Sequence, residues 1–231
     1  MDERLESIFD SIENNRLNAD SPFIFHCTMC GDCCRNREDI LLNPQDLFQL
    51  AKGLQIRPQD VVEKYCEYYI GSQSRMPIVR LKSLGTDKHC VFLENNQCSV
   101  QSFKPTVCAM FPLGRFYSLK TDENNADEGE FGYMLMDAPC GDKREIHTVR
   151  EWLGKYNIPI DDEFYKRWVE VIGKLSVKLA EIEKKVSEAA MNNKWLAVFL
   201  ALYLHYDIKK EFLPQFIQNA ELIVNLIMSE H

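Results

Sequence analysis

The sequence predicts an α+β fold that is mainly α, in which a cysteine-rich part with short strands is covered by C-terminal helices. Three observations lead to this prediction. All nine cysteines lie between residues 27 and 140. The same part of the chain, 21–142, holds seven of the nine prolines and most turn signals, which favour short elements. Residues 143–231 contain no cysteine and place apolar side chains at helical spacing.

These changes in composition set the expected boundaries. Residues 1–20 alternate apolar and charged side chains and predict a short amphipathic N-terminal helix. Residues 21–142 are expected to form a cysteine-cluster domain. Residues 143–231 are expected to form a helical region packed on that domain.

The elements expected in 21–142 follow from caps, breakers and β-forming residues. One helix runs from Pro44 to Lys52 after an Asn43 cap, and a second from Pro58 to Ile70, each followed by a glycine. Clusters of β-branched and aromatic residues predict strands at 78–81, 90–93, 113–119 and 131–136, the last two forming a hairpin with its tip at 121–130.

The C-terminal part reads as four helices. The first covers 147–156, and the second follows a cap at Asp161 or Asp162 and carries an apolar stripe from Phe164 to Val186. The third covers 194–206, and the fourth runs from Pro214 to the end.

Composition narrows the class of protein and its location. The chain has 231 residues and a net charge of −8, so no basic patch for nucleic acid is expected. The first residues are charged and lack the apolar core of a secretory signal. The longest apolar run, 195–204, is far shorter than the roughly 20 residues of a membrane span. We therefore expect a cytoplasmic protein with reduced thiols, in which disulfides are disfavoured.

The strongest chemical signal is the run Cys27-Thr-Met-Cys30-Gly-Asp-Cys33-Cys34. A C-x-x-C spacing lets two sulfurs converge on one metal or cluster, and Gly31 permits a tight backbone turn. Bacterial ferredoxins use a C-x-x-C-x-x-C run for three corners of a cubane cluster. Adjacent side chains point in different directions, so Cys33 and Cys34 are not expected to serve the same metal ion. One of them belongs to a second site or to a second face of the same site.

Four further cysteines complete two possible four-coordinate sets. The eight predicted metal ligands are Cys27, Cys30, Cys33, Cys34, Cys90, Cys98, Cys108 and Cys140. Cys66 lies within a predicted helix and is expected to be a buried, inert thiol. His26 and His89 each precede a clustered cysteine, and a hydrogen-bonding role beside the site is favoured over direct ligation.

Thiolate ligands suit both zinc and iron–sulfur chemistry. Structural zinc usually binds C-x2–4-C pairs separated by a spacer, whereas the first four cysteines form one compact run. This spacing favours one or two 4Fe-4S iron–sulfur clusters, with zinc as the alternative.

At these residues the sequence resembles the YkgJ-like CxxCxxCC cysteine-cluster family, described as zinc- or iron-chelating proteins. The resemblance rests on the run 27–34 followed by Arg35, on Cys90-Val-Phe-Leu with Cys98, on Pro105 with Cys108, and on Phe111-Pro112 and Cys140-Gly141. Two positions depart from the family pattern, because Lys104 and Ala109 stand where arginine is common. Lysine cannot reproduce the bidentate fork of arginine, so any anion contact made by those arginines is in doubt.

Three functions are possible for such a metal centre. Related flagellin lysine N-methylases are associated with an iron–sulfur cluster and S-adenosylmethionine, which implies a methyltransferase acting on lysine of a protein or peptide substrate. The alternatives are a redox or metal-handling protein, and a structural metal site that supports a partner-binding surface. No glycine-rich nucleotide loop and no evident catalytic base is present in the sequence. Five polar residues could supply catalytic groups but are expected to be structural: Tyr117, Tyr133, Asp137, Tyr203 and Asp207.

Overall fold

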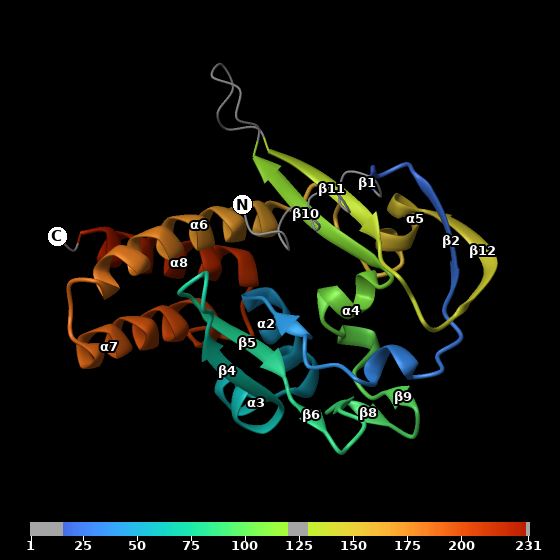
Figure 1. The fold of residues 1–231 in the computed structure, drawn as a ribbon, viewed down its shortest axis with the longest axis horizontal. Coiled ribbons are helices and arrows are strands. Elements are labelled where there is room, and N and C mark those ends of the chain that lie inside the picture. Colours follow the sequence, from blue (N-terminus) through green and yellow to red (C-terminus); the bar gives the residue numbers. More distant parts are fainter. Residues whose placement is uncertain (1–15, 120–128, 230–231) are drawn as a thin grey trace. The chain divides into compact units, whose positions relative to one another are not determined.

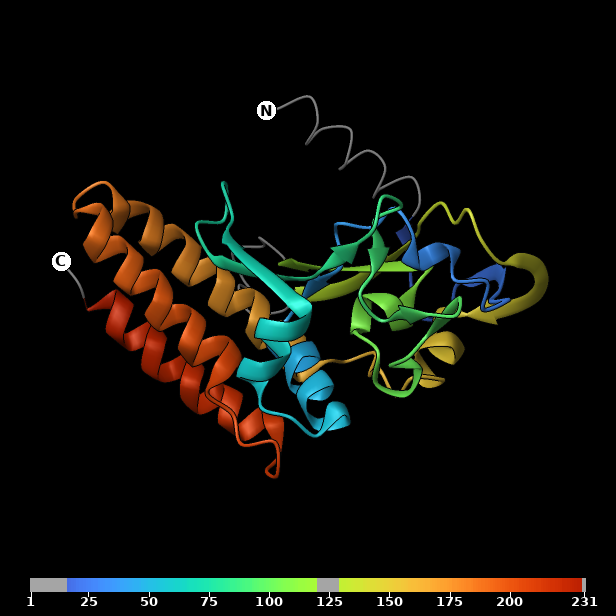
Figure 2. The ribbon, with the colours of Figure 1, turned by 90° about the horizontal axis from the view of Figure 1, so that it is seen from below.

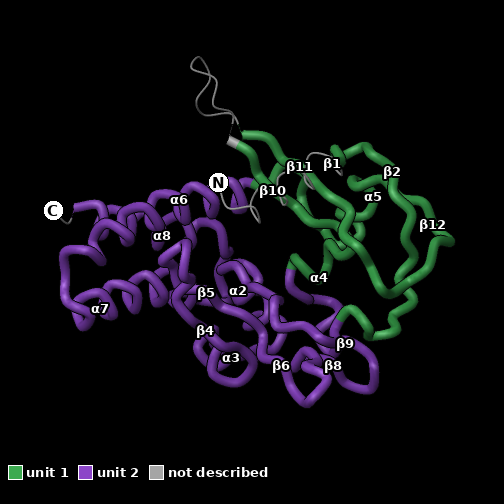
Figure 3. The backbone as a smooth tube through the Cα atoms, viewed as in Figure 1, with its two compact units in different colours: residues 1–33, 106–162 green, residues 34–105, 163–231 purple. Residues whose placement is uncertain are grey.

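The computed structural model describes residues 16–119 and 129–229, and it divides into two compact units. Unit 1 contains 1–33 and 106–162, and unit 2 contains 34–105 and 163–231 (Figure 3). Each unit therefore combines two separate stretches of the chain, whereas composition divides it at residues 20 and 142. Helices and short strands in small sheets confirm the α+β, mainly α, class (Figure 1).

Two predicted segments fall largely outside the described residues. The predicted helix 1–20 lies there up to residue 15, and the part that is described begins with a two-residue strand, β1 (Arg16–Leu17), instead of a helix. The predicted hairpin tip 121–130 lies outside the described residues up to residue 128.

Unit 1 is built on two small antiparallel sheets. The first has the order β1-β11-β10, where β10 is Leu113–Leu119 and β11 is Gly129–Leu135, which confirms the predicted hairpin. The second is a two-stranded ribbon of β2 (Pro22–His26) and β12 (Asp142–Thr148). Two short helices complete the unit, α4 (Thr106–Met110) and α5 (Val149–Gly154).

An aromatic core fixes the position of β2 within unit 1. Because side chains alternate along a strand, Phe23 and Phe25 point into the core and Ile24 points to solvent. Both phenylalanine rings lie edge-on against Trp152 of α5, with centroids 5.8 and 5.7 Å away. The Trp152 indole donates a 3.0 Å hydrogen bond to the carbonyl of Met110 in α4. The chain therefore leaves a rigid core at His26, the last residue of β2.

Unit 2 begins with two helices and a three-stranded sheet. Helix α2 (Pro44–Leu54) starts at a capping box in which Asn43 and Asp46 exchange hydrogen bonds. Helix α3 (Pro58–Tyr65) leads into the sheet, whose order is β3-β5-β4. The three strands are β3 (Leu41–Leu42), β4 (Cys66–Ile70) and β5 (Pro77–Leu81).

Short hairpins and three long helices make up the rest of unit 2. The hairpins pair β6 (Ser83–Leu84) with β7 (His89–Cys90) and β8 (Leu93–Glu94) with β9 (Gln97–Cys98). Two 3-10 turns cover Asp32–Cys34 (η1) and Gln101–Phe103 (η2), η1 leading into the unit. The long helices are α6 (Glu163–Glu183), α7 (Glu188–Phe199), continued by a π-helical turn Leu200–Leu204 (η3), and α8 (Phe212–Met228).

The three long helices pack side by side (Figure 2), and aromatic rings contact one another between them. Phe216 of α8 is fully buried and contacts the rings of Phe164 and Trp168 on α6. Phe48 of α2 joins these rings, which we call the aromatic centre of unit 2, through Phe212, with ring centroids 5.2 Å apart. The predicted apolar stripe of α6 is thus the buried face of that helix. Among the described helices, none combines the length and apolarity needed to cross a membrane.

Three element predictions need correction. The predicted helix 58–70 ends at Tyr65, and Cys66–Ile70 is strand β4, because its aromatic and β-branched residues pair with β5. The predicted strand 90–93 is divided between β7 and β8. The predicted helix 147–156 starts at Val149, because Thr148 caps it and the preceding residues pair with β2.

Candidate metal centre

The loop that follows β2 carries three cysteines of the run at the surface of unit 1. Cys27 and Cys30 are exposed, and Cys33 is half-buried. Met29 and Gly31 have φ angles of 52° and 80°, so the backbone turns through the left-handed region twice within this loop. Two such turns curl the chain back on itself, as a C-x-x-C-x-x-C loop must do to aim its sulfurs at one point.

Cys140 is brought to this loop by the β2–β12 ribbon. His26 pairs with Asp142 at the end of the ladder, so Cys27 and Cys140 both lie just beyond the last pair. Gly141 has a φ of 75°, and a Cβ there would lie 2.7 Å from the carbonyl oxygen of His26. Only glycine therefore allows this close approach of the two backbones.

Electrostatics show that Cys140 lies among the three loop thiols. The pKa of Cys140 is raised to about 12, first by burial and then by the neighbouring thiols of Cys33, Cys30 and Cys27 and a hydrogen bond with Cys30. The three loop thiols thus oppose ionisation of Cys140. A bound cation reverses that relation, because it neutralises the thiolate charges. We call Cys27, Cys30, Cys33 and Cys140 the unit 1 thiol set.

The turn η1 separates Cys33 from Cys34. With about three residues per turn in a 3-10 helix, adjacent side chains point roughly 120° apart. Cys33 belongs to the unit 1 thiol set, whereas Cys34 is the first residue of unit 2. That Cys33 and Cys34 serve different sites stays a prediction.

The other predicted ligands are divided between the two units. Cys108 lies on α4 in unit 1, whereas Cys90 ends β7 and Cys98 ends β9 in unit 2. Arg35, directly after Cys34, binds Asp87 at 2.7 Å and Asn96 at 2.5 Å. These contacts fix the Cys34 end of unit 2 to the two hairpins that carry Cys90 and Cys98.

Cys66 is buried, as expected, but lies at the start of β4 and not within a helix. The pKa of its thiol is raised to about 12, mainly by burial and to a smaller extent by nearby Cys90, against an opposing effect of Lys82. Lys82 explains the proximity: its N–H donates to the carbonyl of Tyr65, and its carbonyl accepts from the N–H of Val91. Lys82 thus links the residue before Cys66 to the residue after Cys90.

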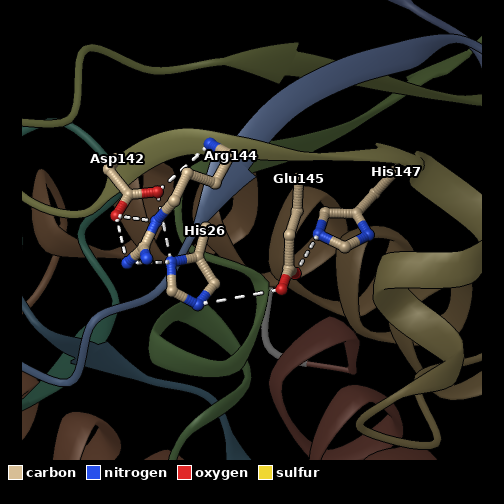
Figure 4. A network of polar contacts seen from close by, with 5 residues as sticks. All are labelled: His26, Asp142, Arg144, Glu145 and His147. Atoms are coloured by element: carbon tan, nitrogen blue, oxygen red, sulfur yellow. Dashed lines mark hydrogen bonds and ion pairs between the residues drawn. The ribbon is translucent and has the colours of Figure 1, made fainter.

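Both histidines next to clustered cysteines have carboxylate neighbours. His26 Nδ1 lies 3.2 Å from Asp142 Oδ1, and His26 Nε2 lies 3.7 Å from Glu145 Oε1 (Figure 4). His89 Nδ1 lies 2.7 Å from Asp87 Oδ1. These contacts fit the predicted hydrogen-bonding role beside the thiols. Sequence reasoning missed Asp142, Arg144 and Glu145, although the charged run right after Cys140-Gly141 could have indicated them.

Two of the five polar residues considered for catalysis are buried. Tyr133 and Tyr203 are 1% and 3% exposed, and burial raises the pKa of both hydroxyls. Neither is placed to exchange a proton with a substrate in solvent, which fits the structural role expected for them.

The donor set was tested for its fit to a metal. Within 16–119 and 129–229, no three His, Cys, Asp or Glu side chains are arranged so that they could hold a metal ion as they stand. The unit 1 thiol set still has the right chemistry, since four cysteine sulfurs suit zinc or an iron–sulfur cluster and Cys140 interacts with each of the other three.

Comparison with known proteins supports the same chemistry. Residues 26–134 match the family model "CxxCxxCC: Putative zinc- or iron-chelating domain". Neither the curated proteins nor the solved structures gave a match. The matched range includes seven of the eight predicted ligands, and only Cys140 lies beyond it. Residues 26–134 are therefore similar to the CxxCxxCC family, whose model is described as a "Putative zinc- or iron-chelating domain".

Proposed function

We propose that this chain is an iron–sulfur protein whose centre in unit 1 is held by Cys27, Cys30, Cys33 and Cys140. The observation that carries the proposal is the arrival of Cys140 among three thiols that already have ferredoxin-like spacing. The zinc- or iron-chelating family supports a metal at these residues and leaves the choice between the two open. The compact C-x-x-C-x-x-C spacing favours iron–sulfur over zinc.

The residues of the chain have separate tasks in this centre. The loop 27–33 supplies three sulfurs, and Cys140, two residues before β12, supplies the fourth from a distant part of the chain. Ligation needs each thiol to lose its proton, and a bound cation favours that loss. Phe25 and Phe111, with ring centroids 6.0 Å apart, belong to the apolar core of unit 1 from which the loop emerges. The remaining predicted ligands, Cys34, Cys90, Cys98 and Cys108, rest on their sequence pattern.

Metal analysis after anaerobic purification tests the proposal. We expect iron and acid-labile sulfide in stoichiometric amounts, a brown chromophore, and a Mössbauer spectrum of a thiolate-bound cluster. A colourless protein with stoichiometric zinc and no sulfide would show that the site binds zinc and would overturn the iron–sulfur proposal. A protein that takes up neither metal would overturn metal binding itself.

Two alanine variants locate the centre. Cys140→Ala should lower the iron and sulfide content, because it removes the fourth sulfur of the unit 1 thiol set. Cys66→Ala is the matched control, since this thiol is buried in unit 2 and outside the set. Equal loss of metal in both variants would contradict the assignment.

A second candidate function is S-adenosylmethionine-dependent methyl transfer to lysine of a protein or peptide. The observation that favours it is the exposure of Cys27 and Cys30, which leaves one side of the centre open to a small molecule. The test combines anaerobic protein, S-adenosylmethionine and lysine peptides, with peptide mass as the readout. Absence of any mass gain, together with absence of cofactor binding in calorimetry, would remove this candidate.

A further inference from the structure

The last pair of the β2–β12 ladder stands beside the unit 1 thiol set. His26 pairs with Asp142, and the next residues outward are Cys27 on one chain segment and Gly141-Cys140 on the other. Cys140 is separated from Cys33 by more than a hundred residues of sequence. Its distance from the loop thiols therefore depends on how firmly this one pair holds.

The pair is cut off from the rest of its own ladder. Between the pairs His26–Asp142 and Ile24–Ile146, β2 has only Phe25, whereas β12 has the three residues 143–145. This irregularity is a bulge of two extra residues in β12. The regular pairing of β2 with β12 is interrupted at this bulge. The backbone hydrogen bonds from Ile146 onward therefore do not hold Asp142 in place.

Side chains of the bulge make up for the lost pairing (Figure 4). Asp142 Oδ1 contacts His26 Nδ1 at 3.2 Å and accepts from the N–H of Arg144 at 3.1 Å. Asp142 Oδ2 accepts from Arg144 Nε at 2.7 Å and lies 2.6 Å from its Nη2. Arg144 Nη2 also lies 3.4 Å from His26 Nδ1. The three side chains, which we call the His26 clamp, join both strands across the irregularity.

The exposure of the clamp indicates what it does. Arg144 is 70% exposed and Asp142 33% exposed, so these contacts add little to global stability. Their effect is local, because they hold one short chain segment against another. That segment carries Cys140.

We propose that the His26 clamp is a positioning device that fixes Cys140 against the loop thiols and thereby sets how tightly the unit 1 thiol set holds its metal. The inference rests on the proposed function and adds three positioning residues to it. Cys140 is then the ligand whose hold on the metal is adjustable, since the other three share one loop. Residues beside a metal site that orient its ligands typically change affinity by about 10- to 100-fold when removed.

Cobalt titration of the metal-free, reduced protein tests this. Co²⁺ replaces zinc in thiolate sites, and its absorption reports how many sulfurs bind and whether the geometry is tetrahedral. Asp142→Ala should weaken Co²⁺ binding by about 10- to 100-fold and lower the tetrahedral absorption. Asp20→Ala is the matched control, because Asp20 binds Arg150 at 2.9 Å at the other end of the same ribbon. Unchanged affinity in Asp142→Ala would overturn the proposal.

A double variant shows whether the clamp acts through Cys140. In a Cys140→Ala background, adding Asp142→Ala should leave Co²⁺ affinity unchanged, because the positioned ligand is already missing. A further loss of similar size in this background would mean that Asp142 acts by another route, and would contradict the proposal. The two proteins in each comparison have the same cysteines. Any Co²⁺ bound at other cysteines therefore contributes equally to both and does not affect the difference.

Amide exchange of the metal-free protein separates this proposal from the proposed function. Asp142→Ala should speed exchange of the Gly141 amide and leave α5 protected. If the wild-type protein bound neither Co²⁺ nor Zn²⁺, the metal function would fail. The exchange rate of the Gly141 amide would still test the His26 clamp. An unchanged rate in Asp142→Ala would reject the clamp.

Discussion

The aromatic centre of unit 2 and the thiol loop of unit 1 are held in place by different means. In unit 2, Phe48, Phe164 and Phe216 are each less than 4% exposed, and several elements pack around them. In the loop, Cys27 and Cys30 are exposed and Met29 is 64% exposed. Burial of apolar surface stabilises the first region, whereas the second has almost none to bury.

The difference shows where a metal matters for structure. A region with its own core folds without an added ion, as unit 2 should. A loop without a core keeps its thiols together only through backbone turns, the ribbon and a bound metal. Removal of metal from the unit 1 thiol set should therefore loosen the loop and leave the aromatic centre of unit 2 unchanged. The following predictions test this difference between the two regions.

The largest effect is expected in the aromatic centre. Phe216→Ala should lower the free energy of unfolding by about 3–5 kcal/mol, because it leaves a cavity among rings that are fully buried. Chemical denaturation measures the loss. Metal content at the unit 1 thiol set should not change. Loss of metal in this variant would show that the two regions are not independent.

A smaller effect is expected where Cys140 joins β12. Gly141→Ala forces a side chain into the left-handed region and against the carbonyl of His26, so we expect a loss of at least about 1–2 kcal/mol and weaker metal binding. Thermal unfolding and metal titration measure the two effects. Gly154→Ala is the control, since a Cβ there meets nothing within 4 Å. Equal behaviour of the two variants would refute the close approach at Gly141.

The helix caps allow a like-for-like comparison of the units. Asn43 caps α2 in unit 2, and Thr148 caps α5 in unit 1, each within a capping box. Replacing either with alanine should cost about 1 kcal/mol, because one backbone N–H loses its acceptor. Denaturant midpoints provide the measurement. A much larger loss for Thr148→Ala would mean that α5 also holds the ribbon in place.

The smallest effect on stability, and the sharpest contrast in chemistry, concerns thiol reactivity. In metal-free protein at pH 8, iodoacetamide should modify exposed Cys27 and Cys30 and leave Cys66 intact. Burial raises the pKa of Cys66 to about 12, so its reactive thiolate is absent at pH 8 and forms only as the pH approaches that value. Peptide mass mapping reads the result. Early labelling of Cys66 would show that unit 2 opens without metal.

Local signals were sufficient for several elements. Asn43-Pro44 placed the start of α2, and the apolar stripe from Phe164 placed the buried face of α6. The hairpin of β10 and β11 followed from its β-forming residues. Each of these depends on neighbours in sequence, on caps, periodicity or turn residues. Local patterns failed at Cys66–Ile70, where pairing with β5 overrode a helical reading.

For the candidate site, local residue spacing was enough to predict a thiolate centre. The spacing of Cys27, Cys30 and Cys33 already implies a thiolate centre, because a short loop can converge its own sulfurs. Only the tertiary structure decided which distant thiol joins them. That choice depends on the pairing of His26 with Asp142 and on the close approach at Gly141, which are contacts between segments far apart in the chain. No local pattern specifies such contacts, since they arise only when the whole of unit 1 packs around its core.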